Sequence, residues 1–432
     1  MTSTTARWLE QAVKLEPGET TAALAAAAYH FCLLSGYFVL RPIRDTMGIA
    51  GGVEQIPWLF LGTFLAMLAA VPVFGLLTAR FRRSVFLPTV YVFFIANILA
   101  FAWAFARMPE QAVLARTFFI WVSVFNLFIV SVFWSFMVDL FSREQSRRIF
   151  GFLAAGGTAG ALIGPLLTGL LAERVGQVAL MLLSAALLTL ALLAIRYLLG
   201  WSQRSPASRL VAGLPADRDR ASRPIGGNPF AGIRLVFSTP YLAGIALFIL
   251  LLTSVSTFLY IEQLKIVETA FATRDARTAF FGKLDALVQA LTITIQLFIT
   301  SRLAARYGVQ ALLVSVPVLM VCGFLALGLA PTLWVLVVVL VIRRALEYSI
   351  TRPAREMLFT TVDTETKYKA KNFIDTVVYR GGDWVSSMVH KLLELVGLGL
   401  SGIAFFGAVI AGIWAGVAFA LGRAHERIRE PQ

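Results

Sequence analysis

Long apolar stretches recur along the whole of this 432-residue chain, and they constrain its fold more than any other feature. A helix needs about 20 apolar residues to cross the hydrocarbon core of a bilayer. Only 14% of the residues are charged, against about 25% in a typical soluble protein. The sequence therefore predicts an all-α, multi-pass membrane protein. Twelve stretches qualify as transmembrane helices: 22–46, 57–79, 84–106, 113–139, 150–172, 178–198, 240–262, 279–300, 309–329, 332–350, 373–395 and 399–422.

The positions of lysine and arginine predict the orientation of these helices. A net charge of +14 would suggest nucleic acid as the partner of a soluble domain. Here the basic residues fall in the short connections, and an excess of them marks the cytoplasmic side. The connections 47–56, 330–331 and 396–398 contain none, whereas the alternate connections and the tail contain many: Arg80, Arg82, Arg83, Arg143, Arg147, Arg148, Arg302, Arg306, Lys367, Lys369, Lys371, Arg423, Arg427 and Arg429. The connection after 240–262, with Lys265, Arg274 and Arg277, is an exception. We predict that both termini are cytoplasmic, and we expect no nucleic-acid partner.

One long polar stretch, residues 200–239, divides the chain. It is rich in arginine, proline and glycine, which predicts a flexible cytoplasmic linker because such a composition cannot form a core. The two halves, 1–199 and 240–432, each contain six predicted helices. They show weak internal sequence repetition, as in Ala79-Arg80-Phe81 and Ala305-Arg306-Tyr307. Two six-helix halves joined in this way are typical of the major-facilitator architecture, in which cargo binds between the halves near the midplane.

Charged residues inside predicted transmembrane helices are the candidates for function, because charge at membrane depth is costly and usually faces a polar cavity. Arg41, Arg44 and Asp45 close the first apolar stretch, and no polar loop follows them. Charged residues also occur in or at the ends of other stretches: Asp139, Glu262, Lys265, Lys283, Asp285, Arg343, Arg344, Glu347, Asp375, Arg380 and Asp383. The surplus of arginine indicates an anionic cargo, since the guanidinium group matches carboxylate and phosphate geometry.

Each of these residues also has a purely structural explanation. Arg343 and Glu347 are four residues apart and can pair on one helix face, and Arg380 and Asp383, three apart, can do the same. The long side chain of Arg41 or Arg44 can reach the headgroup region. For the set as a whole, a cargo cavity is the better explanation.

The sequence lacks the motifs that would indicate several other functions. No phosphate-binding loop of the Gly-x-x-x-x-Gly-Lys-Ser/Thr type occurs, which argues against ATP hydrolysis by this chain. The chain has three histidines and two cysteines, Cys32 and Cys322, both inside apolar stretches. We therefore expect no metal site, no cofactor and no enzymatic activity.

Four motifs resemble the ATP/ADP translocases of plastids and intracellular bacteria. They are Tyr37-Phe-Val-Leu-Arg-Pro-Ile-Arg-Asp-Thr46, Phe133-Trp-Ser-Phe-Met-Val-Asp139, Leu259-Tyr-Ile-Glu262, and the segment Glu347–Met357 followed by Lys367–Asp375. The last pair of segments is the most specific match because it is long and has an unusual order of polar residues. The matching motifs extend from the first predicted helix to the eleventh.

The resemblance implies a nucleotide exchanger and assigns roles to individual residues. Arg44 takes the place of a functional lysine of that family, and Asp139 takes the place of a glutamate. Glu262 corresponds to a second functional carboxylate, and Lys369 or Lys371 to a late functional lysine. Arg44 and Asp139 keep the sign of the charge but change its reach and hydrogen-bond geometry.

We therefore predict a monomeric transporter of nucleotides or related phosphorylated anions in the bacterial cytoplasmic membrane. Its predicted substrate-binding residues are those named for the family resemblance and the cavity charges: Arg41, Arg44, Asp139, Glu262, Arg343, Lys369, Lys371 and Arg380. Three alternatives stay open. Transport could be coupled to protons through Asp139 or Glu262, the cargo could be a drug, lipid or other organic anion, or the protein could be a non-transporting scaffold or sensor.

Overall fold

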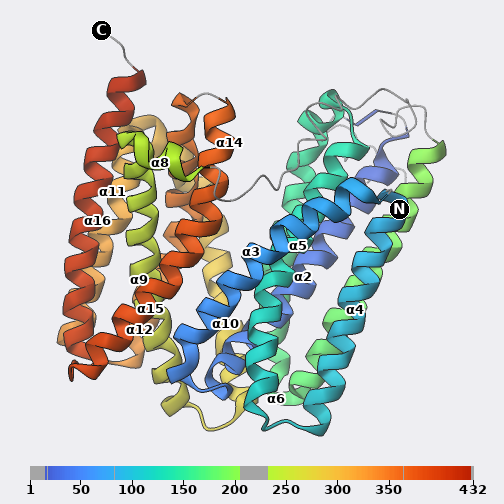
Figure 1. Ribbon diagram of the computed structural model, residues 1–432. Coiled ribbons are helices and arrows are strands. Elements are labelled where there is room, and N and C mark those ends of the chain that lie inside the picture. The colour runs from blue at the N-terminus through green and yellow to red at the C-terminus, as the bar shows by residue number, and fades with distance from the viewer. Residues whose placement is uncertain (1–14, 17, 82, 205–231, 363, 430–432) are drawn as a thin grey trace. The chain divides into compact units, whose positions relative to one another are not determined.

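The computed structural model describes residues 15–16, 18–81, 83–204, 232–362 and 364–429, and within these ranges it contains helices and no strand (Figure 1). In the first half of the chain the helices are α2 (Thr20–Ala50), η1 (Val53–Gln55), α3 (Ile56–Arg80), α4 (Arg83–Arg107), α5 (Ala112–Leu140) and α6 (Arg143–Arg204). In the second half they are α8 (Ile233–Ser238), α9 (Pro240–Ala270), α10 (Arg274–Ile295), η2 (Gln296–Thr300), α11 (Ser301–Leu329), α12 (Leu333–Leu346), η3 (Glu347–Thr351), α13 (Arg352–Leu358), η4 (Phe359–Thr361), α14 (Thr364–Phe373), η5 (Ile374–Val378), α15 (Tyr379–Leu395) and α16 (Leu400–Arg429).

Eight helical segments among the described residues are long and apolar enough to cross a membrane. They are Thr20–Ala50, Val53–Leu77, Ser84–Arg107, Ala112–Leu140, Glu144–Arg204, Pro240–Ala270, Arg274–Leu329 and Leu400–Ile428. The prediction of an all-α, multi-pass membrane protein is confirmed.

Two of these segments are each long enough to hold two predicted transmembrane helices. The segment Glu144–Arg204 is interrupted at Gly176 (φ 77°), and Arg274–Leu329 at Gly308 (φ 73°). Glycine adopts such a positive φ without the clash that a Cβ atom would cause. Two further predicted stretches, 332–350 and 373–395, fall on shorter helices that contain the π-helical turns η3 and η5. The count of twelve transmembrane helices stays a prediction.

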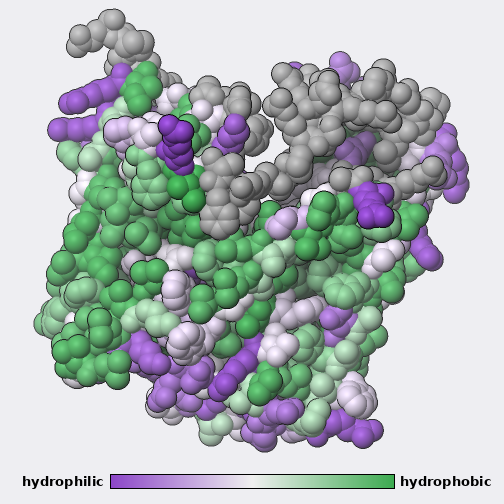
Figure 2. Space-filling view, in the orientation of Figure 1, coloured by the Kyte–Doolittle hydropathy of each residue, from purple (hydrophilic) through white to green (hydrophobic). Residues whose placement is uncertain are grey.

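Large hydrophobic side chains cover the outward faces of the long helices. Phe405, Val409, Ile413 and Phe419 are exposed along α16. Figure 2 shows hydrophobic residues over this helix and hydrophilic residues gathered at its end near the C-terminus. Such a surface is unfavourable in water and suits the hydrocarbon core of a bilayer.

The chain divides into two compact units. Unit 1 comprises Met1–Met47, Val73–Ile225 and Arg274–Ala286, and unit 2 comprises Gly48–Pro72, Gly226–Thr273 and Leu287–Gln432. The first part of α10 therefore belongs to unit 1, and the first part of α3 belongs to unit 2. The predicted division into halves 1–199 and 240–432 stays a prediction.

Within unit 1, α2 and α6 pack with their backbones in close contact. A Cβ atom on Gly156, Gly160 or Gly164 would lie 2.4–2.6 Å from a backbone carbonyl oxygen of α2. The three glycines are four residues apart and so share one helix face. Small residues at this spacing allow helices in a membrane to approach closely, which strengthens van der Waals packing between them.

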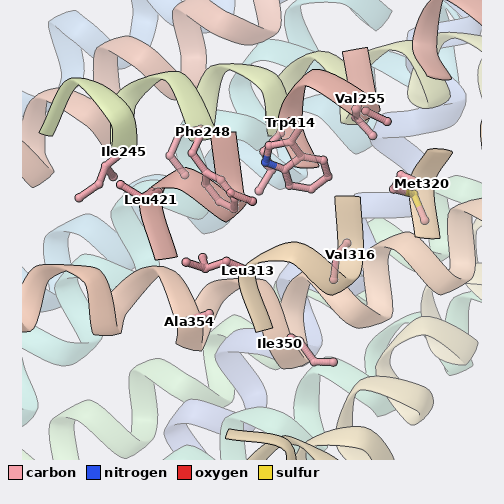
Figure 3. Close-up of a cluster of buried hydrophobic side chains, with 14 of the residues drawn as sticks. Ile245, Phe248, Val255, Leu313, Val316, Met320, Ile350, Ala354, Trp414 and Leu421 are labelled. Carbon is pink, nitrogen blue, oxygen red and sulfur yellow. The ribbon is translucent and has the colours of Figure 1, made fainter. Parts of the chain in front are cut away.

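Unit 2 contains a continuous apolar core (Figure 3). Ile245, Phe248 and Val255 of α9 lie in one cluster with Val316 of α11 and Trp414 of α16, all buried. This core holds together the helices that carry the charged residues of unit 2.

The structure changes one detail of the predicted linker. Residues 205–231 lie outside the described residues, but Ile233–Ser238 forms the helix α8 instead of flexible chain. Val236 of this helix is fully buried in the core of unit 2, and Gly232 is so close to α14 that a Cβ atom would lie 2.4 Å from the carbonyl oxygen of Lys369. Burial of Val236 therefore orders the end of a stretch whose composition indicated a linker.

Candidate functional site

The charged residues of the first motif all lie inside α2, and both arginines have carboxylate partners. Arg41 Nε lies 3.5 Å from Asp285 Oδ2, and Arg44 donates to Asp45 Oδ1 over 2.6 Å. The guanidinium of Arg44 also lies over the Phe119 ring, 5.1 Å from its centroid. Both carboxylates are almost completely buried. The protein thus holds two guanidinium groups within an otherwise apolar helix by ion pairing.

Close backbone packing in unit 1 brings Asp285 to Arg41. A Cβ atom on Gly282 would lie 2.5 Å from the backbone nitrogen of Gly169, so the first part of α10 presses directly against α6. In the first part of α10, the hydroxyl groups of Thr278 and Thr46 of α2 form a hydrogen bond of 2.8 Å, in which either can be the donor. The hydroxyl of Thr278 also accepts a hydrogen bond from Gln177 Nε2 over 3.0 Å. These contacts join α2, α6 and α10 beside the paired arginines.

Glu262 lies in a second charged group, at the ends of α9 and α15 in unit 2. Its Oε1 atom is 2.7 Å from His390 Nε2 and 3.8 Å from Lys265 Nζ. His390 Nδ1 is 3.3 Å from Glu394 Oε1, and Lys265 contacts the same carboxylate. The structure places a predicted site residue among three ionisable neighbours here.

Arg343 and Arg380 each pair within their own chain segment. Arg343 Nη1 donates to Glu347 Oε2 over 2.8 Å and also to the hydroxyl of Ser256. Arg380 Nη1 lies 3.4 Å from Asp383 Oδ2. Both pairings follow the helical spacing expected from the sequence. Arg343 Nε is buried and has no hydrogen-bond acceptor among the described residues.

Lys371 takes part in an ion-pair group between α13 and α14–η5. Its ammonium lies 2.5 Å from Glu356 Oε2, and Arg355 Nη1 lies 3.1 Å from Asp375 Oδ1. Partial burial tends to raise the pKa of Glu356, but the hydrogen bond and charge of Lys371, with the charge of Arg355, outweigh this effect and lower it. This group fastens two short helical segments outside the eight long apolar ones.

The other two predicted site residues occupy helix ends or exposed positions. Asp139 is half-buried in the last turn of α5, and Lys369 is exposed on α14. The structure therefore places Arg41, Arg44 and Asp139 in unit 1, and Glu262, Arg343, Lys369, Lys371 and Arg380 in unit 2.

The partners of Glu262 are not among the predicted site residues. No sequence motif indicates His390 or Glu394 as a partner of Glu262. The available signal was their separation of four residues, which places them on one face of α15. Ligand atoms of Glu262, His390 and Glu394 lie within 4.8 Å of one another, a spacing that a metal ion could use. Lys265, however, already holds a positive charge against both carboxylates.

Comparison with known proteins supports the resemblance seen in the motifs. The chain is 22% identical to ADP,ATP carrier protein 1 of Chlamydia muridarum, over 88% of this chain and 83% of that protein. Identity to ADP,ATP carrier protein 1 of Chlamydia trachomatis is also 22%, over 85% of this chain and 80% of that protein. The resemblance to nucleotide translocases is thus confirmed over most of the chain.

Solved structures with the same fold are transporters. A mutant of the nucleoside transporter NupG aligns with a TM-score of 0.64 and 13% identity, covering 95% of this chain and 100% of that chain. An auto-inhibited POT family peptide transporter gives a TM-score of 0.61 and 15% identity, with coverages of 95% and 98%. The sequence pattern of the Major Facilitator Superfamily matches residues 23–354. These matches cover most of the chain, which belongs to the Major Facilitator Superfamily.

Proposed function

We propose that this protein is an alternating-access transporter that exchanges nucleotides or related phosphorylated anions. The observation that carries the proposal is the pair of arginines in α2, each held by a buried carboxylate. Phosphate oxygens match guanidinium geometry as carboxylate oxygens do, so a phosphorylated cargo can replace Asp45 or Asp285 as the partner. The similarity to proteins named ADP,ATP carrier supports a nucleotide as that cargo.

The paired charges also provide a reason for exchange. Removing one partner of a buried ion pair leaves an uncompensated charge, at a cost of about 3–5 kcal/mol. In the proposed cycle the empty protein retains its own ion pairs, and an anionic cargo replaces the carboxylates without leaving an arginine unpaired. Rocking of the two halves around the loaded site would then move cargo across the membrane.

The remaining predicted residues have proposed roles in the same cycle. Arg343, Arg380, Lys369 and Lys371 supply further positive charge for phosphate groups. Asp139 and Glu262 pair with basic groups when no cargo is bound. We propose that the protein acts as a monomer in the bacterial cytoplasmic membrane, with both termini in the cytoplasm.

Transport in proteoliposomes tests the proposal. Vesicles that contain purified protein are loaded with unlabelled ATP or ADP, and uptake of labelled ATP, ADP, AMP, adenosine and phosphate is measured. We expect uptake of a phosphorylated nucleotide that depends on internal nucleotide. Absence of uptake for every nucleotide overturns the proposal, and uptake of adenosine alone assigns the protein to nucleoside transport.

Arg44→Ala is the informative variant in this assay. Loss of a buried charge contact to the cargo should reduce exchange at least about tenfold, which corresponds to about 1.4 kcal/mol. Arg107→Ala removes the same side chain from the exposed end of α4 and serves as the matched control. If Arg44→Ala transports as well as Arg107→Ala does, the cargo is not held by this arginine, and another class of cargo becomes the better assignment.

A further inference from the structure

Two segments of unit 2, far apart in the sequence, carry the same pattern of residues. Both read Phe-x-x-x-Arg-x-x-x-Arg, at residues 298–306, across η2 and the start of α11, and at residues 419–427, near the end of α16. Residues four apart lie on the same face of a helix. In each segment a phenylalanine is therefore followed, on its own face, by two arginines in the next two turns.

The two segments lie at the same end of the closely packed helices α11 and α16. A Cβ atom on Gly422 would lie 2.6 Å from Gln310 Cγ, and one on Gly308 would lie 3.6 Å from Glu426 Oε1. Gln310 Nε2 also donates to the carbonyl oxygen of Phe419 over 3.4 Å. Both pairs of arginines therefore belong to one end of this helix pair.

Each pattern lies where an outward apolar surface ends. Phe298 is 58% exposed and Phe419 is 44% exposed, and all four arginines that follow them are exposed. Val409 and Ile413 are exposed earlier along α16, and Figure 2 shows the change from hydrophobic to hydrophilic residues along this helix. Because the apolar surface faces the hydrocarbon core, the arginines lie at the level of the lipid headgroups.

The positive charge at this end is not neutralised within the described part of the protein. None of the four arginines forms an ion pair with a described residue. The partly exposed Arg148 and Arg355, by contrast, both pair with carboxylates. Glu426 is the one acidic residue in the sequences of α11 and α16. The four arginines and this glutamate together have a formal charge of +3.

Aromatic rings position two of the guanidinium groups at this boundary. The Arg423 guanidinium lies 4.5 Å from the centroid of the Phe419 ring, and that of Arg306 lies 5.4 Å from the centroid of the exposed Tyr307 ring. Tyrosine favours the interface between hydrocarbon and water. A guanidinium that stacks on a ring still presents the N–H groups at its edge to an anion.

We propose that this end of α11 and α16 binds an anionic phospholipid, whose phosphate contacts the arginines and whose acyl chains contact the exposed phenylalanines. Guanidinium groups match phosphate geometry, and basic surfaces between membrane helices suit anionic headgroups. Membrane topology requires positive charge in a connection, but it does not require arginine at every fourth residue beside an exposed ring. The apolar surface favours a lipid over a free phosphate compound, which has no acyl chain to cover it. The site does not depend on the proposed transport function.

Lipid binding to the purified full-length protein in detergent tests the proposal. The probe is phosphatidylglycerol with a fluorescent acyl chain, and phosphatidylcholine with the same chain is the neutral reference. We expect the protein to bind phosphatidylglycerol at least about tenfold more tightly, since each arginine near an anionic lipid contributes about fivefold. Equal affinity for the two lipids overturns the proposal.

The arginines of α16 can be compared with an isolated arginine. Arg423→Gln combined with Arg427→Gln should weaken phosphatidylglycerol binding at least about tenfold. Arg107→Gln is the matched control, because Arg107 also lies over an exposed ring, that of Trp103, but has no second arginine one turn further on. An equal loss in the control contradicts a site at this end of the helices.

Glu426→Gln should have the opposite effect. It removes the carboxylate beside the arginines, so phosphatidylglycerol should bind about fivefold more tightly, with no change for phosphatidylcholine. A purely structural role of these residues would not change the affinity in opposite directions. Weaker binding of phosphatidylglycerol to this variant contradicts the proposal.

Cross-linking locates the site and identifies the source of the phosphate. With a photoreactive group in the acyl chain of phosphatidylglycerol, we expect cross-links in residues 297–307 and 413–428. Cross-links confined to other segments overturn the location. Displacement of the lipid by millimolar inorganic phosphate or ATP would assign the surface to a free phosphorylated ligand and overturn the lipid as its occupant.

Discussion

At the scale of single residues, three buried or nearly buried arginines of this protein are held in ion pairs, and each pair constrains both of its members. Arg41 pairs with Asp285, Arg44 with Asp45, and Arg343 with Glu347. A buried pair contributes little net stability compared with apolar residues of the same size, but loss of one partner is costly. The pairs are therefore better explained by function than by stability.

Arg343→Met tests the cost of an unpaired charge. The change leaves Glu347, whose side chain is 8% exposed, without its guanidinium partner. We expect the free energy of unfolding in detergent to fall by about 3–5 kcal/mol, and the double variant with Glu347→Leu to recover most of this loss. Arg302→Met, at an exposed position of α11, should change stability by less than about 0.5 kcal/mol. A double variant as unstable as Arg343→Met would contradict this explanation.

At the scale of helices, close packing depends on residues with little or no side chain. Gly156, Gly160 and Gly164 bring α6 against α2, and Gly282 brings α10 against Gly169 of α6. The position of Arg41 relative to Asp285 depends on these contacts, because the two residues lie on different helices that α6 joins. The spacing of small residues is visible in the sequence, but the helix that they contact is not.

Gly160→Ala tests this packing. The added Cβ atom would lie 2.4 Å from the carbonyl oxygen of Phe31, so one of the two helices must move. We expect a loss of about 1–3 kcal/mol in stability, measured by thermal unfolding in detergent. Gly151→Ala, in the same helix but with nothing within 4 Å of the new atom, is the matched control. It should be neutral or slightly stabilising, since alanine favours a helix by about 1 kcal/mol over glycine. Equal effects of the two changes would show that backbone contact does not limit this interface.

The ion pairs between α13 and α14 make a pH-dependent contribution to the free energy of unfolding. The pKa of Glu356 is lowered in the folded protein, so its pairing with Lys371 stabilises the fold at pH values above the unfolded pKa of about 4.3 and loses this effect as pH falls through the folded value. We expect the stability difference between wild type and Glu356→Gln to be constant above about pH 5 and to shrink as pH falls below the unfolded pKa of about 4.3. Glu426→Gln, at an exposed position of α16, gives the baseline. A difference that does not shrink at low pH would argue against the pairing.

At the scale of the whole molecule, the charge of the connections predicts how the chain lies in the membrane. Gly399 and Glu426 are exposed near opposite ends of α16, so they should face opposite sides. In a variant without Cys32 and Cys322, we expect Gly399→Cys to react with an impermeant maleimide added to intact cells. Glu426→Cys should react only after permeabilisation, because positive connections stay in the cytoplasm. The reverse pattern would invert the predicted orientation.

The sequence by itself determined the class of this protein and the positions of its unusual charges. The length of an apolar stretch and the position of a charged residue within it are local properties of the sequence. They were sufficient to predict an all-helical membrane protein with charged residues inside α2, α9, α12 and α15. The pairs Arg343–Glu347 and Arg380–Asp383 could also be predicted, because a helix sets the distance between residues three or four apart. The motifs indicated the resemblance to the nucleotide translocases because each motif is a short, continuous segment that can be recognised without knowing the fold.

Only the tertiary structure decided which distant charges meet. Arg41 lies beside Asp285 because glycines in α6 and α10 allow the backbones of these two helices to touch. Glu262 lies beside His390 and Glu394 because α15 packs against α9 in unit 2. The periodicity of a helix reports which face is apolar but not which helix covers that face. Pairing between helices depends on the shape of both surfaces, and that information is spread over residues far apart in the chain.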